Sequence, residues 1–302
     1  MDFNLDETQQ DLRKLAAEVL ARDDPAQALE QAELLSICLP ESAGGAGLGP
    51  VEMAVVLREV GARAHSGPVL ARLVSTLAIS RYGTAEHHRR FADAELTTVA
   101  VTDGLSGVPY GLQARAILVA ADDGLHLIDG PAMGIEEFTS TGEPAATVDG
   151  ARTRIAGPEA AEGTRQLYTA AVAAQASGVL AGALELTTGY IRTRRQFGRA
   201  LAEFQAVTMQ IADVYVAGRA LDVAMWSGAW RLAAGLPAQE DLAVAAFHVS
   251  EAFRALYTCQ HLHGGLGLDV TYPLHRYFAH AKHLAHVLGG ADAQLDRIGA
   301  LA

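Results

Sequence analysis

The hydrophobic positions in the first third of the chain recur at helical spacing. Asp6, with Gln9 three residues later, resembles a capping box that begins a helix, and apolar side chains then follow at Leu12, Leu15, Val19 and Leu20. A glycine-rich segment, PESAGGAGLGP, interrupts the pattern over residues 40–50. A second helical run follows, with apolar positions at Val55, Val56, Val60 and Leu70. We therefore expect a helical domain over residues 1–95.

The pattern changes between residues 96 and 160. Short runs rich in β-branched residues are separated there by Gly, Asp and Pro: TTVAVTDG, ARAILVAA, GLHLID and AATVDG. They predict a small β domain of roughly sixty residues, which is near the lower limit for holding a hydrophobic core alone. We expect this domain to rest on its helical neighbours.

From residue 161 to residue 302 the pattern is helical again. One face of a long amphipathic helix is predicted at Leu201, Phe204, Thr208, Ile211, Tyr215, Gly218 and Met225. Breaks are expected near Gly198, at residues 235–237, at Gly264-Gly265 and at Gly289-Gly290. Helices with such short connections form a bundle. The predicted fold is mainly α, with a small β domain between an N-terminal helical domain and a C-terminal four-helix bundle.

Composition narrows the possible partners and compartments. The formal net charge of −12 argues against nucleic acids and anionic membranes, because both need a basic surface. The first residues lack the features of a signal peptide, and no apolar run is expected to approach the ~20 residues that span a bilayer. Cys38 and Cys259 form no disulfide framework and have no metal-ligand spacing. A reducing, cytoplasmic location is expected.

Several motifs resemble those of the acyl-CoA dehydrogenases. The segment RRQFG at residues 194–198, followed by Leu201 and Phe204-Gln205, is similar to the R-x-x-F-G…L…F-Q signature of that family. HLHGGLG at residues 261–267 resembles its Q-x-x-G-G-x-G turn, and the segment after Pro40 resembles its P-E-x-x-G-G-x-G-L motif. Each match is weak alone, but together they run along the whole chain at consistent spacing and in the expected order of domains.

The resemblance implies contacts to an FAD that a neighbouring subunit holds. The implied contact residues are Arg194, Phe197, Gln205, His261, Gly264 and Gly265. Arginine offers a planar donor fork to a pyrophosphate, and glycines let backbone N–H groups approach a dinucleotide closely. His261 stands where the family usually has glutamine. The alternative is that Arg194 is a solvated cation at a helix end and that the two glycines only end a helix.

The same resemblance implies that the catalytic base is missing. The family removes an α-proton from an acyl-CoA with a positioned carboxylate, usually the Glu of an E-G-T motif. Counted from the double glycine, that position holds Leu288, and the position that some members use instead holds Tyr168. Neither is a carboxylate. Glu185 and Asp292 lie nearby in the sequence, and a structural role is expected for both.

Elements that would hold a flavin of the chain's own are also missing. The T-E-P-x-A-G-S-D loop of the family is reduced to TDGLSG at residues 102–107. Its W-I-T strand needs a tryptophan in the β domain, but Trp226 and Trp230 both fall in the predicted bundle, where packing is their expected role. The contacts to a neighbour's FAD are thus retained while those to an FAD of its own are lost.

This asymmetry resembles the non-catalytic subunit of actinobacterial α2β2 acyl-CoA dehydrogenases that act on steroid side chains. The similarity extends over residues 261–277 and the following Leu288-Gly289-Gly290. It implies a catalytic partner subunit, a shared FAD, a steroid-type acyl-CoA substrate, and an electron-transfer flavoprotein or similar acceptor. The chain alone is expected to be inactive.

Two other functions stay open. One is a homomeric flavoenzyme with an atypical base such as Asp292, or with a related reaction such as dehydration. The other is a non-redox homologue that binds an acyl-CoA or a partner. Seven of the eleven histidines follow Phe247, and His280 and His283 share a helical face. No Cys or carboxylate has ligand spacing with that pair, so no metal site is expected.

Overall fold

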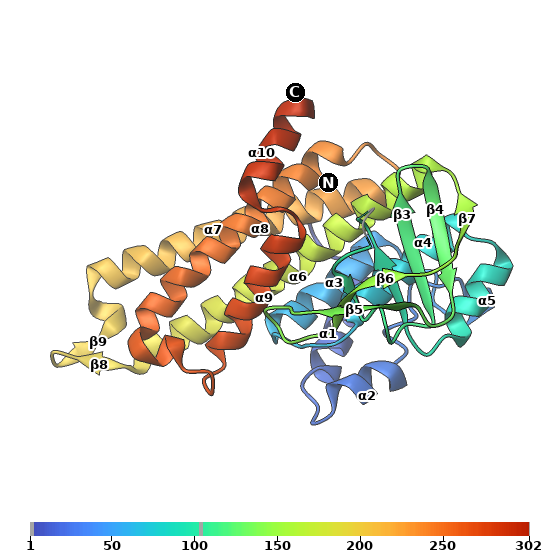
Figure 1. Cartoon of the computed structure of the whole chain (residues 1–302). Coiled ribbons are helices and arrows are strands. Elements are labelled where there is room, and N and C mark those ends of the chain that lie inside the picture. Colours follow the sequence, from blue (N-terminus) through green and yellow to red (C-terminus); the bar gives the residue numbers. More distant parts are fainter. Residues whose placement is uncertain (1–2, 103–104, 302) are drawn as a thin grey trace.

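The computed structural model describes residues 3–102 and 105–301, and it has the predicted order of helices, strands and helices (Figure 1). Asp6 caps the first helix as predicted: Gln9 N donates to Asp6 Oδ1 (2.8 Å), and Asp6 N donates to Gln9 Oε1 (3.1 Å). The N-terminal helices are α1 (Glu7–Val19), α2 (Pro25–Gln31), α3 (Pro50–Ala62), α4 (Val69–Tyr82) and α5 (Ala85–Asp93), with a 3₁₀ turn at Glu41–Ala43.

The second predicted helical run is two helices. The chain turns between α3 and α4, where Gly67 has a φ of 157° and Pro68 follows it. Helix α3 already ends at Ala62, just before Ala64 adopts a φ of +43°, and α4 begins at Val69, so Leu70 belongs to the next helix.

The middle region forms two small sheets. Their strands are β1 (Thr97–Ala100), β2 (Val108–Pro109), β3 (Ala116–Ala121), β4 (Gly124–Asp129), β5 (Met133–Glu137), β6 (Ala145–Asp149) and β7 (Arg152–Ala156). One sheet has the order β1-β3-β4-β7 and the other β2-β6-β5; only the β1–β3 pair is parallel among the pairs described. The four predicted runs correspond to β1, β3, β4 and β6. The sequence pattern missed β2, β5 and β7.

Strands β1 and β3 of the first sheet are buried throughout, whereas its edge strand β7 is largely exposed. Along β3, Leu118 and Ala120 pack into the core shared with the helices, while Ile117 and Val119 pack into a second core with residues of the other sheet. Successive side chains of a strand point to opposite faces, so one strand serves both cores. The strands rest on α4 and α6, as predicted.

The C-terminal half is a helical bundle with breaks at the predicted glycines. Its elements are α6 (Pro158–Thr193), the hairpin of β8 (Arg195–Gln196) and β9 (Arg199–Ala200), a 3₁₀ turn (Leu201–Glu203), α7 (Gln205–Ala233), α8 (Gln239–His263), a 3₁₀ turn (Gly264–Leu268), α9 (Leu274–Val287) and α10 (Gly290–Leu301). Gly198, Gly235, Gly264 and Gly289 adopt positive φ, where a side chain is strained. The changes between helix and strand fall near residues 95 and 160, although the division into three domains stays a prediction.

The predicted apolar face of α7 is only partly right: Met225 is buried and Ile211 packs against the core, but other predicted positions do not pack in this way. Leu201 and Phe204 precede the helix, and Thr208 and Tyr215 are exposed. The buried face instead comprises Val214, Leu221, Asp222, Ala224, Met225, Gly228, Ala229 and Leu232. Apolar side chains of α7 also occur on its exposed side, for example Met209, Val216 and Val223. The spacing of apolar residues alone therefore does not identify the face that packs.

We expected no apolar run of nearly membrane-spanning length, and helix α6 contradicts that expectation. It is long and apolar enough to cross a bilayer, but 83% of its most apolar stretch is buried inside the protein. Figure 1 shows α6 running through the centre of the molecule, from the sheets to the hairpin of β8 and β9. It is therefore the central core helix.

Helices α3 and α6 cross in close contact because both have glycine at the crossing. A Cβ on Gly178 would overlap the carbonyl oxygen of Arg58, and a Cβ on Gly61 would overlap that of Gln175. The backbones approach too closely for any side chain to fit between them.

Replacing Gly178 by alanine should therefore destabilise the protein. We expect Gly178→Ala to cost about 1–3 kcal/mol through overpacking, measured as a lower midpoint of thermal unfolding. Gly189→Ala is the matched control on the same helix, because its Cβ meets nothing within 4 Å. The control should be neutral or slightly stabilising. Equal midpoints for the two variants would contradict the close crossing.

A polar cluster joins the three parts of the chain. The Glu143 carboxylate, between β5 and β6, accepts hydrogen bonds from Gly67 N (2.8 Å) and from Tyr110 Oη (3.1 Å). Beside it, Ser66 Oγ lies 3.3 Å from His280 Nε2 of α9. The α3–α4 loop, the sheets and α9 are thus connected through neighbouring side chains.

This cluster predicts lower stability in mild acid. Burial lowers the pKa of His65, His280 and His283 below the ordinary value of 6.5, while the Glu143 carboxylate acts in the opposite direction. The unfolded chain therefore binds more protons just below pH 6.5, so stability is fully present above that pH and is lost as the pH falls. Thermal unfolding should show a falling midpoint between about pH 7.5 and about pH 5.5. His280→Gln keeps a partner for Ser66 and should flatten this dependence; an unchanged slope would contradict the assignment.

Candidate functional site

Three of the predicted contact residues lie at the hairpin end of the bundle, away from the sheets (Figure 1). Arg194 is the C-cap of α6: its N–H donates to Tyr190 O (2.8 Å), and its carbonyl accepts from Leu201 N (2.9 Å). The Arg194 side chain is exposed. Phe197 is 92% exposed and adopts a φ of +50°, and Gln205 begins α7 in an exposed position.

This end of the bundle carries concentrated positive charge in a chain with a net charge of −12. The exposed side chains there include Arg192, Arg194, Arg195 and Arg199. The Arg199 guanidinium lies 4.0 Å from the centroid of the Phe204 ring, and Phe197 packs edge-on against the same ring. These contacts hold the hairpin in place and leave the Arg194 side chain available to an anion.

The glycine turn follows α8 at the same end of the bundle. Gly264 has φ 60° and ψ −137°, which only glycine adopts readily. A Cβ on Gly267 would lie 2.5 Å from the Gln260 carbonyl oxygen, whereas a Cβ on Gly265 would meet nothing within 4 Å. Gly264 and Gly267 are therefore required by the fold, and Gly265 is not. Because Gly265 has no side chain, its backbone is accessible to a molecule outside this chain.

Two residues that the sequence analysis missed connect the arginine to the glycine turn. The His263 ring stacks on Tyr190, with centroids 4.4 Å apart, and Tyr190 Oη donates to the His263 carbonyl (3.4 Å). His263 Nδ1 lies 2.8 Å from the Cys259 carbonyl oxygen, and burial lowers the pKa of the ring. Tyr190 lies one turn before Arg194, so this stack brings both motifs to one end. The position of Tyr190, four residues before Arg194, was the available signal.

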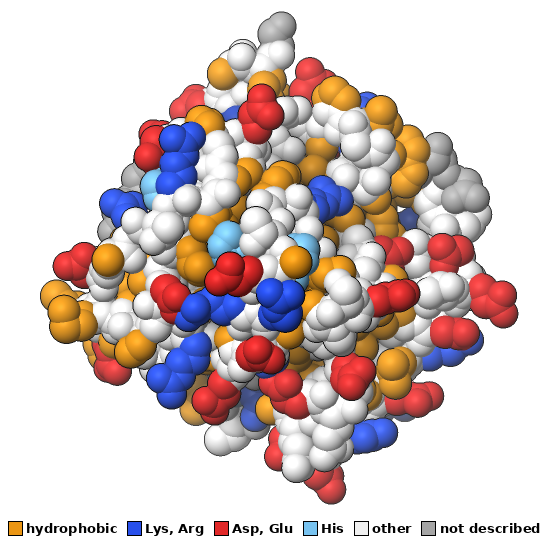
Figure 2. Space-filling view, turned by 90° about the vertical axis from the view of Figure 1, so that its right-hand side faces the viewer, with side chains coloured by type: hydrophobic (Ala, Val, Ile, Leu, Met, Phe, Trp, Pro, Cys, Tyr) orange, Lys and Arg blue, Asp and Glu red, His pale blue; other side chains and the backbone are white. Residues whose placement is uncertain are grey.

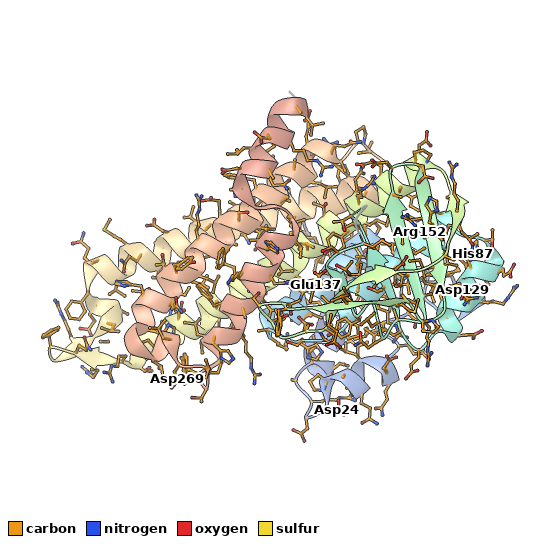
Figure 3. All side chains as sticks on the ribbon, in the orientation of Figure 1. Asp24, His87, Asp129, Glu137, Arg152 and Asp269 are labelled. Atoms are coloured by element: carbon orange, nitrogen blue, oxygen red, sulfur yellow. The ribbon has the colours of Figure 1, made fainter. Side chains whose placement is uncertain are left out.

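The remaining predicted contact, His261, is exposed on the last turn of α8. Figure 3 labels Asp269, just after the glycine turn, and Glu137 on β5, and the two lie well apart. The hairpin end and the sheet end are therefore separate places on the molecule.

A cavity of about 660 Å³ lies at the sheet end. Its walls come from β1, β2, the segment after β5, α6 and α9. Figure 2 views the molecule from the side of the sheets, where apolar side chains lie open between charged ones. A small cavity of about 50 Å³ adjoins it and shares Tyr168, His283 and Val287.

Neither predicted base position offers a base in this cavity. Tyr168 lines it, and burial raises the pKa of its hydroxyl to about 12, so it stays protonated at neutral pH. Leu288 is the half-buried C-cap of α9, and its carbonyl accepts from Gln294 Nε2 (2.5 Å). Among the lining residues that the structure describes, neither Glu185 nor Asp292 is present.

The carboxylates that do line these cavities were missed by the sequence analysis. Glu143 is held in the polar cluster described above. Glu137 accepts from Ser106 Oγ (3.0 Å), Gly107 N (3.1 Å) and, in a short contact, Thr147 Oγ1. The Thr147 bond and those from Ser106 and Gly107 lower the pKa of Glu137, so it is ionised at neutral pH. The donors of the 102–107 loop are thus used within the chain; Asp103 and Gly104 of that loop lie outside the described residues.

Within the part of the chain that the structure describes, no three His, Cys, Asp or Glu side chains are grouped to hold a metal ion. Trp226 and Trp230 line a surface groove together with Phe3 and Leu5. Trp226 is partly buried against the core and Trp230 is 38% exposed, so both tryptophans belong to the bundle and not to the large cavity.

Comparison with known proteins agrees with this arrangement. Residues 5–97 match the model of the acyl-CoA dehydrogenase N-terminal domain, and residues 157–301 match that of the C-terminal domain. The acyl-CoA dehydrogenase FadE28 of Mycobacterium tuberculosis is 36% identical over 99% of this chain and 98% of its own length.

Two solved structures are similar over nearly the whole chain. A variant of the Tcur3481-Tcur3483 steroid ACAD has 33% identity and a TM-score of 0.89, over 98% of this chain and 97% of the other. The ChsE4-ChsE5 complex from Mycobacterium tuberculosis has 30% identity and a TM-score of 0.89, over 99% and 98%. The fold, the two domain matches and these identities lead to one conclusion: this chain belongs to the acyl-CoA dehydrogenase family, a family of oxidoreductases.

Proposed function

We propose that this chain is the supporting subunit of a heteromeric FAD-dependent acyl-CoA dehydrogenase. The observation that carries the proposal is the separation of the two sites along α6. Arg194 follows Tyr168 by 26 residues of that helix, or about 39 Å at 1.5 Å per residue. A flavin dinucleotide seated in this chain's own cavity is too short to reach Arg194. The contacts at the hairpin end therefore serve a flavin that another subunit holds.

The residues at the hairpin end fit the pyrophosphate portion of FAD. The exposed Arg194 offers a charged donor fork, and the empty space over Gly265 admits a ligand close to the backbone. Phe197, Gln205 and His261 are exposed around them. When bound, FAD supplies the acceptor for the hydride that leaves the acyl chain, while this chain's residues only bind and orient it.

The residues around the large cavity do not fit a flavin of this chain's own. Ser106 Oγ and Gly107 N donate to the Glu137 carboxylate and are therefore not available to a flavin. The ionised Glu137 at the cavity wall would repel a pyrophosphate. Neither Tyr168 nor Leu288 offers a carboxylate, so the base for the α-proton comes from the partner subunit.

The similarity to a steroid ACAD and to a two-protein complex supports the partner and the substrate class. The partner is a catalytic acyl-CoA dehydrogenase subunit, arranged with this chain as α2β2. The substrate is an acyl-CoA with a steroid side chain, which is desaturated between the α and β carbons. The electrons pass on to an electron-transfer flavoprotein or a similar acceptor.

The chain expressed alone should retain little FAD. The expected result is a colourless protein, because the loop donors are bonded to Glu137 and the complementary contacts are on the partner. The measurement is the flavin absorbance of the purified chain, with acyl-CoA turnover as a second readout. A yellow, active homomer would instead support a homomeric flavoenzyme with an atypical base.

Arg194 gives the sharpest test of the shared flavin. A charge-assisted hydrogen bond contributes roughly 1.5–3 kcal/mol, so Arg194→Ala should weaken FAD binding by the complex about tenfold to hundredfold. Arg194→Lys should recover only part of this, because an ammonium keeps the charge but loses the fork. The measurement is a flavin titration of the apo complex reconstituted with each variant.

Arg195→Ala is the matched control, since this neighbouring arginine is equally exposed and lies outside the R-x-x-F-G motif position. It should reduce FAD affinity less than Arg194→Ala. Thermal melts should be unchanged for all three variants, because both side chains are exposed at a helix end. Intact assembly with unchanged FAD affinity in Arg194→Ala would show that this residue is only a surface cation.

A further inference from the structure

Helix α7 exposes a row of apolar side chains at a spacing of seven residues. Met209 is 62% exposed, Val216 63%, Val223 47% and Trp230 38%. The row extends for about 32 Å along the helix, at 1.5 Å per residue. Figure 1 shows α7 along an outer edge of the bundle. An apolar surface of this length on a soluble protein marks an interaction site.

The spacing of the row indicates what kind of surface fits it. A repeat of seven residues keeps apolar side chains facing a second helix that crosses at a shallow angle. Three residues after each member of the row stand Ala212, Arg219, Trp226 and Ala233, of which three are apolar. These are the two core positions of a heptad, so the partner of this face is another long helix.

The face formed by α7 carries no net charge. Four of the 29 residues of α7 are charged: Asp213, Arg219, Asp222 and Arg231. Arg219 lies 3.1 Å from Asp222, and Arg231 lies 2.7 Å from Asp241 of α8. Because the whole chain has a net charge of −12, copies of it repel one another over much of their surface. A neutral, apolar face is where a second copy can approach.

The row is centred on its helix. Helix α7 runs from residue 205 to residue 233, so its midpoint is residue 219, and the row from 209 to 230 has nearly the same midpoint. A two-fold axis at that point overlaps two antiparallel copies of α7 along their full length. It places Val216 against Val223 of the second copy, and Met209 against Trp230. The row is therefore complementary to itself, as an isologous interface requires.

The two ends of the row also fit each other. At the tryptophan end, Trp226 and Trp230 line a groove of about 390 Å³ together with Phe3 and Leu5. At the other end, the exposed Met209 projects from α7. Methionine is unbranched and fills irregular apolar gaps well. In the antiparallel arrangement the Met209 side chain of one copy reaches the groove of the other.

We propose that a second copy of this chain docks on this face, with the two α7 helices packed antiparallel about the two-fold axis. The two Asp213 side chains then lie about 20 Å apart along the helices, well beyond the screening length of roughly 8 Å. Each Arg219, next to the axis, keeps its own Asp222. In the proposed α2β2 complex this contact joins the two supporting subunits. It does not depend on the shared flavin, so it can fail while the Arg194 test succeeds.

The first experiment measures the molar mass of the full-length chain by sedimentation over about a hundredfold range of concentration. A reversible dimer is expected. Val223→Asp should weaken dimerisation at least about tenfold, because each new carboxylate faces an apolar side chain of the other copy. Leu295→Asp is the control: Leu295 is 51% exposed on α10, outside the row, and its replacement should leave the dimer unchanged. Thermal melts establish that both variants are folded.

A second experiment tests the register by disulfide cross-linking. The two native cysteines are buried and do not interfere. The double variant Val216→Cys/Val223→Cys should form a covalent dimer under mild oxidation. Each single variant should not, because the same position in the two copies is about 10 Å apart along the helices, too far for a disulfide.

A chain that stays monomeric at every concentration would overturn the proposal, as would a dimer that Val223→Asp leaves intact. Efficient cross-linking of either single cysteine variant would contradict the antiparallel register. A monomeric chain whose Val223→Asp variant loses only its assembly with the catalytic subunit would assign this face to that subunit, and would also overturn the proposal.

Discussion

The close crossing of α3 and α6 is the constraint on which the rest of the structure depends. Gly61 and Gly178 let the two backbones touch, so α6 is fixed at its middle against the N-terminal helices. The same helix supports the strands near its start and ends at the hairpin. Because a helix of this length is stiff, fixing Gly178 also fixes Tyr168, ten residues before it, and Arg194 at the C-terminal end. The separation of the two sites is thus a property of one packed helix.

The sheet end shows how the cavity is kept open. Glu143 and Glu137 are both engaged by hydrogen bonds, the first to the α3–α4 loop and the second to the short loop before β2. Ser140 Oγ also donates to the Ala279 carbonyl (2.8 Å), which links the segment after β5 to α9. Polar bonds at the rim therefore connect the sheet region to the α3–α4 loop and to α9.

The sequence predicted those features that depend on local chemistry. Glycines at the helix breaks, the Asp6 cap and the β-branched runs each have a local physical cause, and the structure contains all of them. Features that depend on packing were not predictable in this way. The apolar period of α7 pointed to Tyr215, which is exposed, and β5 was missed because Met133 and Ile135 are exposed at a sheet edge. For the site, the motifs located Arg194 and the glycine turn, whereas the His263–Tyr190 stack depends on two helices meeting.

The strongest argument for function comes from residues that the fold does not need. Gly264 and Gly267 are explained by backbone conformation and by close contact, so their presence says nothing about a ligand. Neither backbone conformation nor close contact requires a glycine at position 265. Phe197 exposes nearly all of its ring and has a strained φ. Among the residues that the structure describes, the Phe197 ring has only the edge-on contact with Phe204, and the space over Gly265 is empty. Both lie at the end of the bundle that carries Arg194, which is where the proposed flavin contact would cover them.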